Sequence, residues 1–325
     1  MKDIIKISVV FTVFAALIPA IVFLSAKGRA AQPAKAEPSP SEKVYIKVLD
    51  EKSGKVTEYE ETDFTVLSLM AQIPSGYEDE AIKAQAVLIR TYLARRKAAE
   101  KSSPDKALKG ALLSTDRSKY QTFFTEKQAK KYFGSDYEAV YEKLYALVID
   151  TEGETLTYKG EPVVPAYHAV SCGVTRSAED AWGEDIPYLT SVKSEADKNS
   201  PDYETTFSIP VDELRQKLIK AFPDADFDDS KTFLELENDK NGIITKAKVC
   251  GKEVGSGELC RALELSSPCA AVKFSGSKAV FTVRGLGHLV GLSLYGANEM
   301  AKGGKTHREI LEYYFKGAKI TDRTS

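Results

Sequence analysis

The stretch from Arg284 to Gly304, RGLGHLVGLSLYGANEMAKGG, combines closely spaced glycines with one histidine, His288. Glycine lets a backbone turn tightly or approach a ligand closely, because it has no side chain. His288 is the natural polar group to face a ligand bound against such a backbone. The residues alone leave two interpretations open: His288 lies in a binding groove, or it is satisfied within the structure.

A second candidate stretch, residues 167–189, has the sequence YHAVSCGVTRSAEDAWGEDIPYL and holds the chain's only tryptophan. Its turn-rich start predicts a rigid loop that presents an aromatic ring. Trp182 or Tyr188 would stack on a sugar ring, or the tryptophan would fill the core under a long loop. His168 and Cys172 are too few ligands for a zinc site, so we predict no metal.

A helix is expected after the turn at Pro74, and it would position these loops. Ser75, with Glu78 three residues later, is a capping-box pattern that predicts a helix start near Ser75. One face of this helix carries the apolar stripe Ile82, Ala86, Ile89 and Leu93. Arg90 shares another face with Lys83 and Lys97, and the polar residues Gln85 and Tyr92 share a further one. This polar side of the helix either lines a groove or is solvated.

The helix sequence EAIKAQAVLIRTYLA, from Glu80 to Ala94, resembles EALKAQAVAARTYAL, the signature helix of the stage II sporulation protein D family. The 167–189 stretch resembles that family's HSTSGGxTExxxxxWGxxxPYLxxV, with Val170 at the family's threonine. The glycine-rich stretch resembles its GxGHGVGMSQYGAxxMAxxG. The resemblance covers residues 43–320 and implies a lytic transglycosylase that cleaves peptidoglycan, leaves 1,6-anhydro sugar ends and needs no cofactor.

The catalytic acid of the resembled family is the glutamate of a Glu-Met-Pro turn, and this chain has Gln72 at that position. Cleavage without water needs an acid that protonates the leaving oxygen, and its conjugate base then assists the attack of a sugar hydroxyl. A carboxamide does neither. Nearby carboxylates are explained by the helix start, where the helix dipole favours them: Glu78, Asp79 and Glu80.

Two further positions depart from the family pattern. Leu289 replaces a glycine and Leu294 replaces a glutamine. If the glycine position has a positive φ angle, a leucine is strained there.

The resemblance implies a glycan-binding groove built from the Gln72 turn, the helix that follows it and the two loops. The expected substrate-binding residues are Gln85, Arg90, Tyr92, His168, Ser171, Trp182, Tyr188, His288, Ser293 and Tyr295. We therefore predict a protein of sporulation or cell-wall remodelling that binds peptidoglycan glycan strands and whose transglycosylase activity is lost or reduced. Whether it is an enzyme is left open.

Two alternatives to this function remain. One is an active lytic transglycosylase of spore engulfment that uses another acid, and the other is a structural wall-anchored protein without glycan affinity. The resembled enzymes work beside an amidase and a membrane protein of the engulfment machinery. The expected partners are therefore peptidoglycan strands and those two classes of protein.

The composition is that of a globular protein, with 43% hydrophobic and 28% charged residues. The net charge of −2 gives no electrostatic case for nucleic-acid binding. Residues 7–26 carry no charge and, at about 1.5 Å per residue, are long enough to span the roughly 30 Å hydrocarbon core. We therefore expect residues 1–26 to be a retained single-pass membrane anchor, or alternatively a removed signal peptide, with the body outside the cytoplasm.

The domain organisation follows from composition. Residues 27–42 are rich in Ala, Pro and Ser and predict a flexible linker, residues 43–320 one domain, and residues 321–325 a tail. Cys250, Cys260 and Cys269 cluster in sequence while Cys172 is remote, which leaves open one disulfide within the cluster or free thiols.

Short strands and helices without regular βαβ alternation predict an α+β fold. Strands are expected over 43–49, 56–59, 232–236, 243–249 and 279–284. Helices are expected over 138–148, 211–222, 259–265 and 309–316, and residues 62–70 are either helix or strand. Turns at Glu152-Gly153 and Lys159-Gly160 are each expected to separate two strands.

Overall fold

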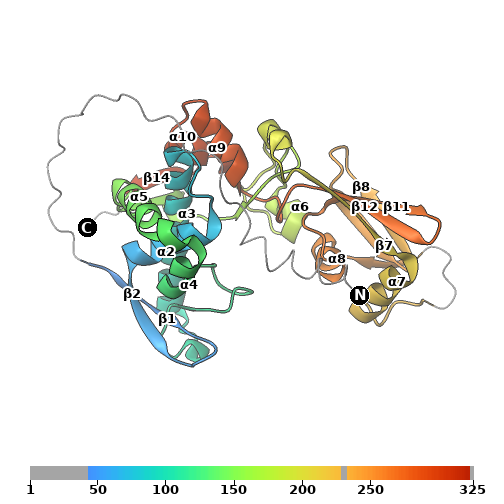
Figure 1. Ribbon diagram of the computed structural model, residues 1–325, viewed down its shortest axis with the longest axis horizontal. Coiled ribbons are helices and arrows are strands. Elements are labelled where there is room, and N and C mark those ends of the chain that lie inside the picture. The colour runs from blue at the N-terminus through green and yellow to red at the C-terminus, as the bar shows by residue number, and fades with distance from the viewer. Residues whose placement is uncertain (1–42, 228–232, 323–325) are drawn as a thin grey trace. The chain divides into compact units, whose positions relative to one another are not determined.

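The computed structural model describes residues 43–227 and 233–322, which form short strands and helices (Figure 1). The predicted α+β class is confirmed. The predicted anchor, residues 1–26, and the predicted linker, residues 27–42, lie outside the described residues. The end of the predicted tail, residues 323–325, does so too. Within the described part, no helix is both long and apolar enough to cross a membrane.

The chain divides into two compact units. Of the described residues, the first unit contains those up to Gly76 together with Arg96–Ile149, and the second contains Tyr77–Arg95 together with those from Asp150 onward. Helix α3, Asp79–Ser102, contributes its first part to the second unit and its end to the first.

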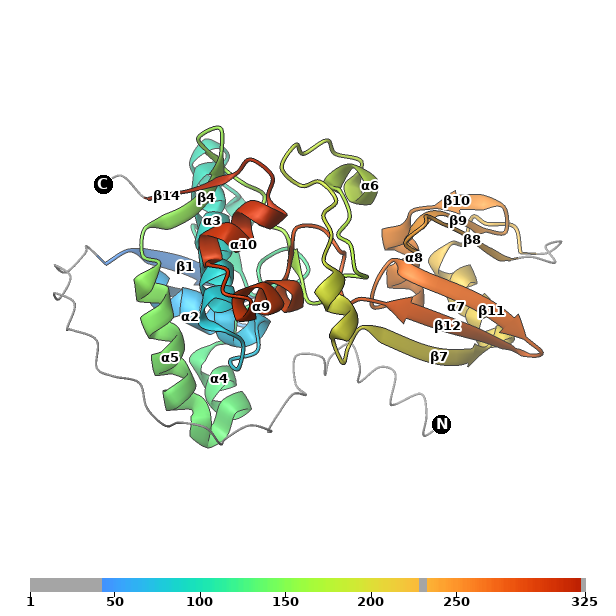
Figure 2. The ribbon, with the colours of Figure 1, turned by 90° about the horizontal axis from the view of Figure 1, so that it is seen from above.

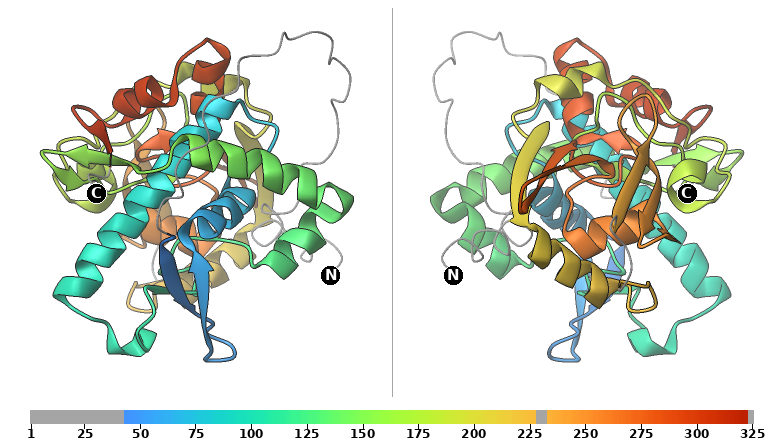
Figure 3. Two further views of the ribbon diagram at one scale, coloured as in Figure 1. Left: turned by 90° about the vertical axis from the view of Figure 1, so that its left-hand side faces the viewer. Right: turned by 90° about the vertical axis from the view of Figure 1, so that its right-hand side faces the viewer.

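The first unit contains the antiparallel hairpin predicted near the start of the domain, seen from two sides in Figure 3. Its strands are β1, Tyr45–Leu49, and β2, Val56–Glu60, and β3, Leu113–Ser114, pairs parallel to β1. The helices of this unit are α2 (Glu61–Gln72), α4 (Glu126–Phe133) and α5 (Tyr137–Asp150). The stretch 62–70 is therefore helical, and α5 confirms the helix expected over 138–148.

One predicted turn has a different context. The Glu152-Gly153 turn follows the end of α5 rather than a strand, because the helical pattern continues to Asp150. After this turn, β4, Glu154–Tyr158, pairs with β5, Glu161–Pro162, across the Lys159-Gly160 turn as expected.

Helix α3 begins at Asp79, later than the predicted start at Ser75. The capping-box prediction is wrong, since both Ser75 and Glu78 precede the first helical residue. Asn298 Oδ1 accepts a hydrogen bond from the backbone N–H of Glu78 at 2.8 Å. The predicted apolar stripe is confirmed, since all four of its side chains are fully buried: Ile82, Ala86, Ile89 and Leu93.

In the second unit, three antiparallel strands form a sheet in the order β11-β12-β7 (Figure 2). A second sheet has the order β10-β9-β8, and helices α7 and α8 share one hydrophobic core with both sheets. The strands are β7 (Glu204–Pro210), β8 (Leu234–Asn238), β9 (Ile244–Val249), β10 (Lys252–Val254), β11 (Cys269–Ser275) and β12 (Lys278–Arg284). The helices α7 (Val211–Ala221) and α8 (Ser256–Leu263) confirm the expected ones, with α8 shifted toward the N-terminus.

The rest of the second unit holds the candidate loops. A parallel pair joins β6, Tyr167–His168, to β13, Leu292–Ser293. A further sheet has the order β14-β4-β5, with β14 at Lys319–Asp322. The helices are α6 (Ala178–Trp182), α9 (Leu294–Lys302) and α10 (His307–Tyr314), and α10 confirms the predicted terminal helix.

Residues 285–291, here called the glycine loop, lie directly against residues 166–176, here called the histidine segment. Isolated bridges join Val170 to Leu286 and Arg176 to Val290. The approach is close enough to exclude side chains: a Cβ atom added at Gly291 would lie 2.1 Å from the carbonyl oxygen of Ala166. The loop is therefore glycine-rich because two backbones touch there.

We predict that Gly291→Ala destabilises the protein by at least about 2 kcal/mol, because the added methyl group meets a backbone atom that cannot rotate away. Gly304→Ala is the matched control, since Gly304 also has a positive φ (+85°) but nothing lies within 4 Å of an added Cβ. Urea unfolding followed by circular dichroism measures both variants. Equal losses would show that backbone conformation, rather than the close approach, requires glycine at position 291.

Candidate functional site

Three aromatic rings from separate segments meet beside the glycine loop. The ring centroids of His168 and His288 lie 6.0 Å apart, and Trp182 meets His288 edge-on at 5.6 Å. Trp182 is 41% exposed, so it does not fill the core, and that alternative for its role is wrong. The structure thus brings together three of the predicted site residues around an exposed indole.

Both imidazoles are held neutral. Burial and the neighbouring His288 lower the pKa of His168 to about 3, and burial of the ring with the nearby charge of Arg176 lowers the pKa of His288 to about 4. His288 Nδ1 accepts a hydrogen bond from the backbone N–H of Val290 at 3.1 Å. Near neutral pH, neither ring is a source of protons for a bound ligand.

Two buried polar atoms here lack a hydrogen-bond partner among the described residues. They are Nε2 of His168, 3% exposed, and Nε of Arg176, 6% exposed. The other ring nitrogen of His168 lies 3.1 Å from the carbonyl oxygen of Val290. Since buried polar groups are nearly always paired, these two atoms favour a polar ligand at this place.

Asp197 ties the histidine segment to the start of α9, and the sequence analysis did not identify it. Its Oδ2 accepts hydrogen bonds from the backbone and the hydroxyl of Ser171, and its Oδ1 accepts one from the Ser293 hydroxyl at 2.8 Å. The carboxyl is fully buried, and burial raises its pKa although the serine hydrogen bonds act to lower it. Ser171 and Ser293 are also fully buried, so their hydroxyls position loops.

The other predicted binding residues lie in varied surroundings. Tyr188 is 9% exposed, packs against Tyr158 and accepts a hydrogen bond from the backbone N–H of Val164. Tyr295 is half-buried on α9. On α3, Tyr92 is half-buried, Gln85 is buried, and Arg90 is buried and donates to the carbonyl and hydroxyl oxygens of Thr151 at 2.5 and 2.8 Å. Their assignment to ligand binding stays a prediction.

Gln72 is the last residue of α2, in the first unit. Its side-chain amide donates to the carbonyl oxygen of Thr122 at 2.6 Å, and its Oε1 accepts from Nε2 of Gln121 at 3.4 Å. The donation to a carbonyl oxygen requires an N–H at this place, which an ionised glutamate lacks. The local hydrogen bonds are therefore adapted to the carboxamide.

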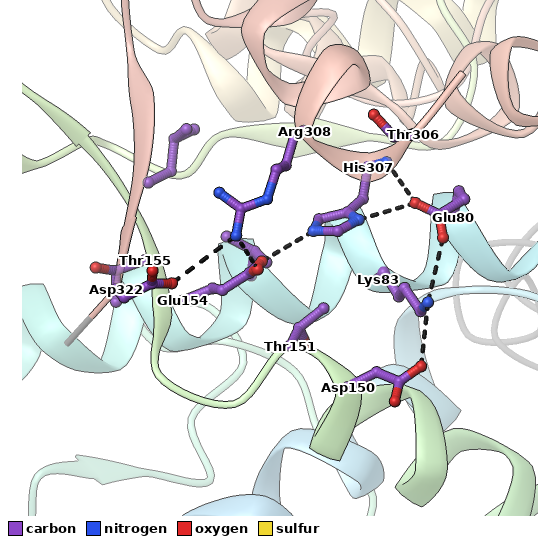
Figure 4. Close-up of polar contacts among 12 residues, drawn as sticks. Glu80, Lys83, Asp150, Thr151, Glu154, Thr155, Thr306, His307, Arg308 and Asp322 are labelled. Atoms are coloured by element: carbon purple, nitrogen blue, oxygen red, sulfur yellow. Dashed lines mark hydrogen bonds and ion pairs between the residues drawn. The ribbon is translucent and has the colours of Figure 1, made fainter. Parts of the chain in front are cut away.

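Glu80 belongs to an ionic network that includes His307, as Figure 4 shows. His307 Nδ1 lies 2.8 Å from Glu80 and its Nε2 lies 2.9 Å from Glu154, which also pairs with Arg308. Burial acts to raise the pKa of Glu80, but the hydrogen bonds from His307 and Lys83 outweigh it and lower the pKa. A carboxyl with a lowered pKa is a poor general acid.

The two departures from the family pattern are both buried. Leu289 has φ +66° and is fully buried, so the left-handed conformation suspected for this position is confirmed. A leucine there carries backbone strain of order 1–3 kcal/mol that its burial must offset. Leu294 is 3% exposed and belongs to the first turn of α9.

Among the described residues, no group of three or more His, Cys, Asp or Glu side chains is arranged to hold a metal ion.

The chain is similar to proteins of bacterial sporulation. The family described as Stage II sporulation protein matches residues 50–158. Stage II sporulation protein D of Bacillus subtilis (strain 168) is 34% identical over 80% of this chain and 74% of its own length. The protein of the same name from Bacillus amyloliquefaciens is 33% identical, over 81% and 74%. An amidase enhancer of Bacillus subtilis is 23% identical over 77% of this chain but only 39% of its own length.

The His307 network predicts a pH-dependent contribution to stability. Both ring nitrogens face carboxylate oxygens, which only accept hydrogen bonds, so the site favours the doubly protonated ring. Burial acts to lower the pKa of His307, but Glu154 and Glu80 outweigh it and raise the pKa. The stabilisation is therefore complete below the ordinary histidine pKa of about 6.5 and is lost as pH rises through the folded value.

We expect His307→Gln to lower the free energy of unfolding by roughly 1–3 kcal/mol at about pH 5.5 and by clearly less at about pH 8.5. Lys97→Gln is the control, because Lys97 pairs with Glu61 rather than with Glu80 or Glu154 and stays charged throughout this range, so its loss should cost about the same at both values. Urea unfolding at the two pH values measures the effect. A His307→Gln cost that does not change with pH would contradict a charged imidazole.

Proposed function

Because the chain belongs to the stage II sporulation protein D family, we propose that it binds peptidoglycan glycan strands during cell-wall remodelling of the sporulation type. We propose further that its lytic transglycosylase activity is lost or strongly reduced. The observation that carries this is the carboxamide of Gln72, which occupies the position of the family's general acid and donates a hydrogen bond to Thr122. Loss of general acid catalysis alone lowers the rate by about 10²- to 10⁴-fold.

Glycan binding is proposed at the cluster of Trp182, His168 and His288. An exposed indole suits the apolar face of a sugar ring, and it stands beside two buried polar atoms without described partners, on His168 and Arg176. Hydroxyl and acetamide groups of a glycan supply both donors and acceptors for such atoms. The neutral imidazoles suit hydrogen bonding to an uncharged sugar.

The carboxyls of the second unit give little support to a replacement acid. Asp197 has the raised pKa that a general acid needs, but it is fully buried and both of its oxygens accept hydrogen bonds from serines. Glu80 has a lowered pKa and is bound to His307. Neither is arranged to pass a proton to a sugar oxygen, so binding without efficient cleavage is the better proposal.

The location and partners are proposed from sequence. Residues 7–26, uncharged and long enough to span a bilayer, would anchor the protein in the cell membrane with its body outside the cytoplasm. The matches to a sporulation protein and an amidase enhancer support partners in a wall-remodelling assembly, such as an amidase and a membrane protein.

For the missing acid, we predict that the wild-type protein releases few or no 1,6-anhydro products from denuded glycan strands, measured by mass spectrometry. Gln72→Glu should raise product formation by about 10²-fold or more, because it restores the proton donor. Gln128→Glu is the control: it adds the same charge in the same unit and keeps the capping box of α4, where Oε1 accepts from the backbone N–H of Thr125 at 2.8 Å. Ordinary enzyme rates in the wild type would overturn the proposal.

For glycan binding, we predict that Trp182→Ala weakens the affinity for uncleaved strands by roughly three- to tenfold, because the stacking surface is lost. Trp182→Tyr should recover most of the affinity. Phe274→Ala is the control, since Phe274 is an exposed aromatic residue on β11 of the same unit. Calorimetric titration with purified strands measures all three variants, and unchanged affinity in Trp182→Ala would place the binding surface elsewhere.

A further inference from the structure

Two cysteines far apart in sequence lie together in the second unit. Cys172, in the histidine segment, and Cys269, the first residue of β11, are 5% and 2% exposed. They pack in one small apolar cluster with Ile243 and Leu289. Cys172 is remote from the other cysteines in sequence, but the fold brings it into one cluster with Cys269.

The two thiols contact one another. Their side chains pack in the same four-residue cluster, and the Cys269 thiol is the neighbour that most strongly lowers the pKa of the Cys172 thiol. Each sulfur also has a backbone neighbour on its own side, Val174 O at 3.6 Å from Cys172 and Asn241 O at 3.4 Å from Cys269. Two buried thiols packed in one cluster are placed for a disulfide, which needs the two cysteines to lie close together.

The other two cysteines have different neighbours. Cys250 and Cys260 are partly buried against the core formed by α7, α8 and the sheets β7–β12. Burial raises the pKa of the Cys260 thiol to about 11, so this thiol is a poor nucleophile near neutral pH. Cys172 and Cys269 are therefore the pair that we expect to be cross-linked.

We propose that Cys172 and Cys269 form a disulfide that fastens the histidine segment to strand β11. The bond would lie beside the candidate site, because Cys172 follows Ser171, which binds Asp197. The disulfide would hold the histidine segment at Cys172, while Asp197 holds it at Ser171 by hydrogen bonds. This proposal is independent of what the site binds.

The chemistry is a thiol–disulfide exchange with a low-molecular-weight or protein disulfide as oxidant. The thiolate of Cys172 attacks one sulfur of the oxidant and releases its other half as a thiol. The Cys269 thiol then loses its proton and attacks the Cys172 sulfur of the mixed disulfide, which releases the second half. Two protein thiols are oxidised and one disulfide is reduced to two thiols. The neighbouring Cys269 thiol lowers the pKa of the Cys172 thiol, which suits its role as first nucleophile.

Access decides when the bond forms. Both sulfurs are buried in the folded protein, so an oxidant reaches them during folding or local opening. Once formed, the cross-link closes a long loop of the chain and restricts the unfolded state, so the oxidised protein should resist denaturant better.

The test is refolding of the chain in a glutathione buffer rich in the oxidised form, followed by alkylation of free thiols and mass spectrometry of unreduced peptides. We expect one linked pair of peptides, containing Cys172 and Cys269, two hydrogens lighter than the sum of the free peptides, with Cys250 and Cys260 alkylated. The urea midpoint should be higher for the oxidised protein than after reduction. Alkylation of all four cysteines, or a link involving Cys250 or Cys260, would overturn the proposal.

Two variants test whether the cross-link is formed by Cys172 and Cys269. The double variant Cys250→Ser/Cys260→Ser should form the same cross-link and show the same shift of the urea midpoint on reduction. Cys172→Ser should form no cross-link and show no such shift. If Cys172→Ser does not fold, the double variant and the peptide map of the wild type still decide, because neither depends on it.

Discussion

The close contact between the glycine loop and the histidine segment is the constraint on which the candidate site depends. At Gly291 the two backbones leave no room for a methyl group, and at Gly287 an added Cβ would lie 2.7 Å from the Cβ of His168. This contact places His288 beside His168, and Trp182 packs edge-on against the His288 ring. Side chains between the two backbones would move the rings apart. The glycines are needed here because they have no side chain.

Residues outside the glycine loop must hold this contact in place, because two backbones that touch without side chains bury little apolar surface. Asp197 holds the two segments together by accepting hydrogen bonds from Ser171 in the histidine segment and from Ser293 on β13. Hydrogen bonds to an ionised carboxylate are stronger than those between neutral groups. Burial raises the pKa of the Asp197 carboxyl, and the serine hydrogen bonds favour its ionised form. Asp197 is thus better explained as a structural clamp than as a catalytic acid.

The sequence predicted well whatever depends on neighbours along the chain. The β1–β2 hairpin, the apolar stripe of α3 and helices α5, α7 and α10 follow from local periodicity and turn residues. The sequence raised strain at Leu289 only on the condition that this glycine position has a positive φ, and the structure meets that condition. These features need no knowledge of which distant segments meet.

Contacts between distant segments were missed. The backbone N–H of Glu78, just before α3, binds the distant Asn298, and α3 begins later than the local pattern at Ser75 indicated. Asp197 lies in a short polar stretch with no periodic pattern, so its burial has no signal in the sequence. The contact between Cys172 and Cys269 depends on how the histidine segment meets β11, which residue spacing does not encode.

Proton supply separates binding from cleavage in the part of the chain that forms the candidate site. His168 and His288 have pKa values near 3 and 4, so near neutral pH they hold no proton that is acidic enough to give to a leaving sugar oxygen. His307 has a raised pKa, but both of its nitrogens are bound to carboxylates. The groups that could carry a proton are thus engaged in holding the structure, while the atoms left unpaired, on His168 and Arg176, can only form hydrogen bonds. A site of this kind recognises a polar, uncharged chain better than it breaks one, and the carboxamide of Gln72 is consistent with that division.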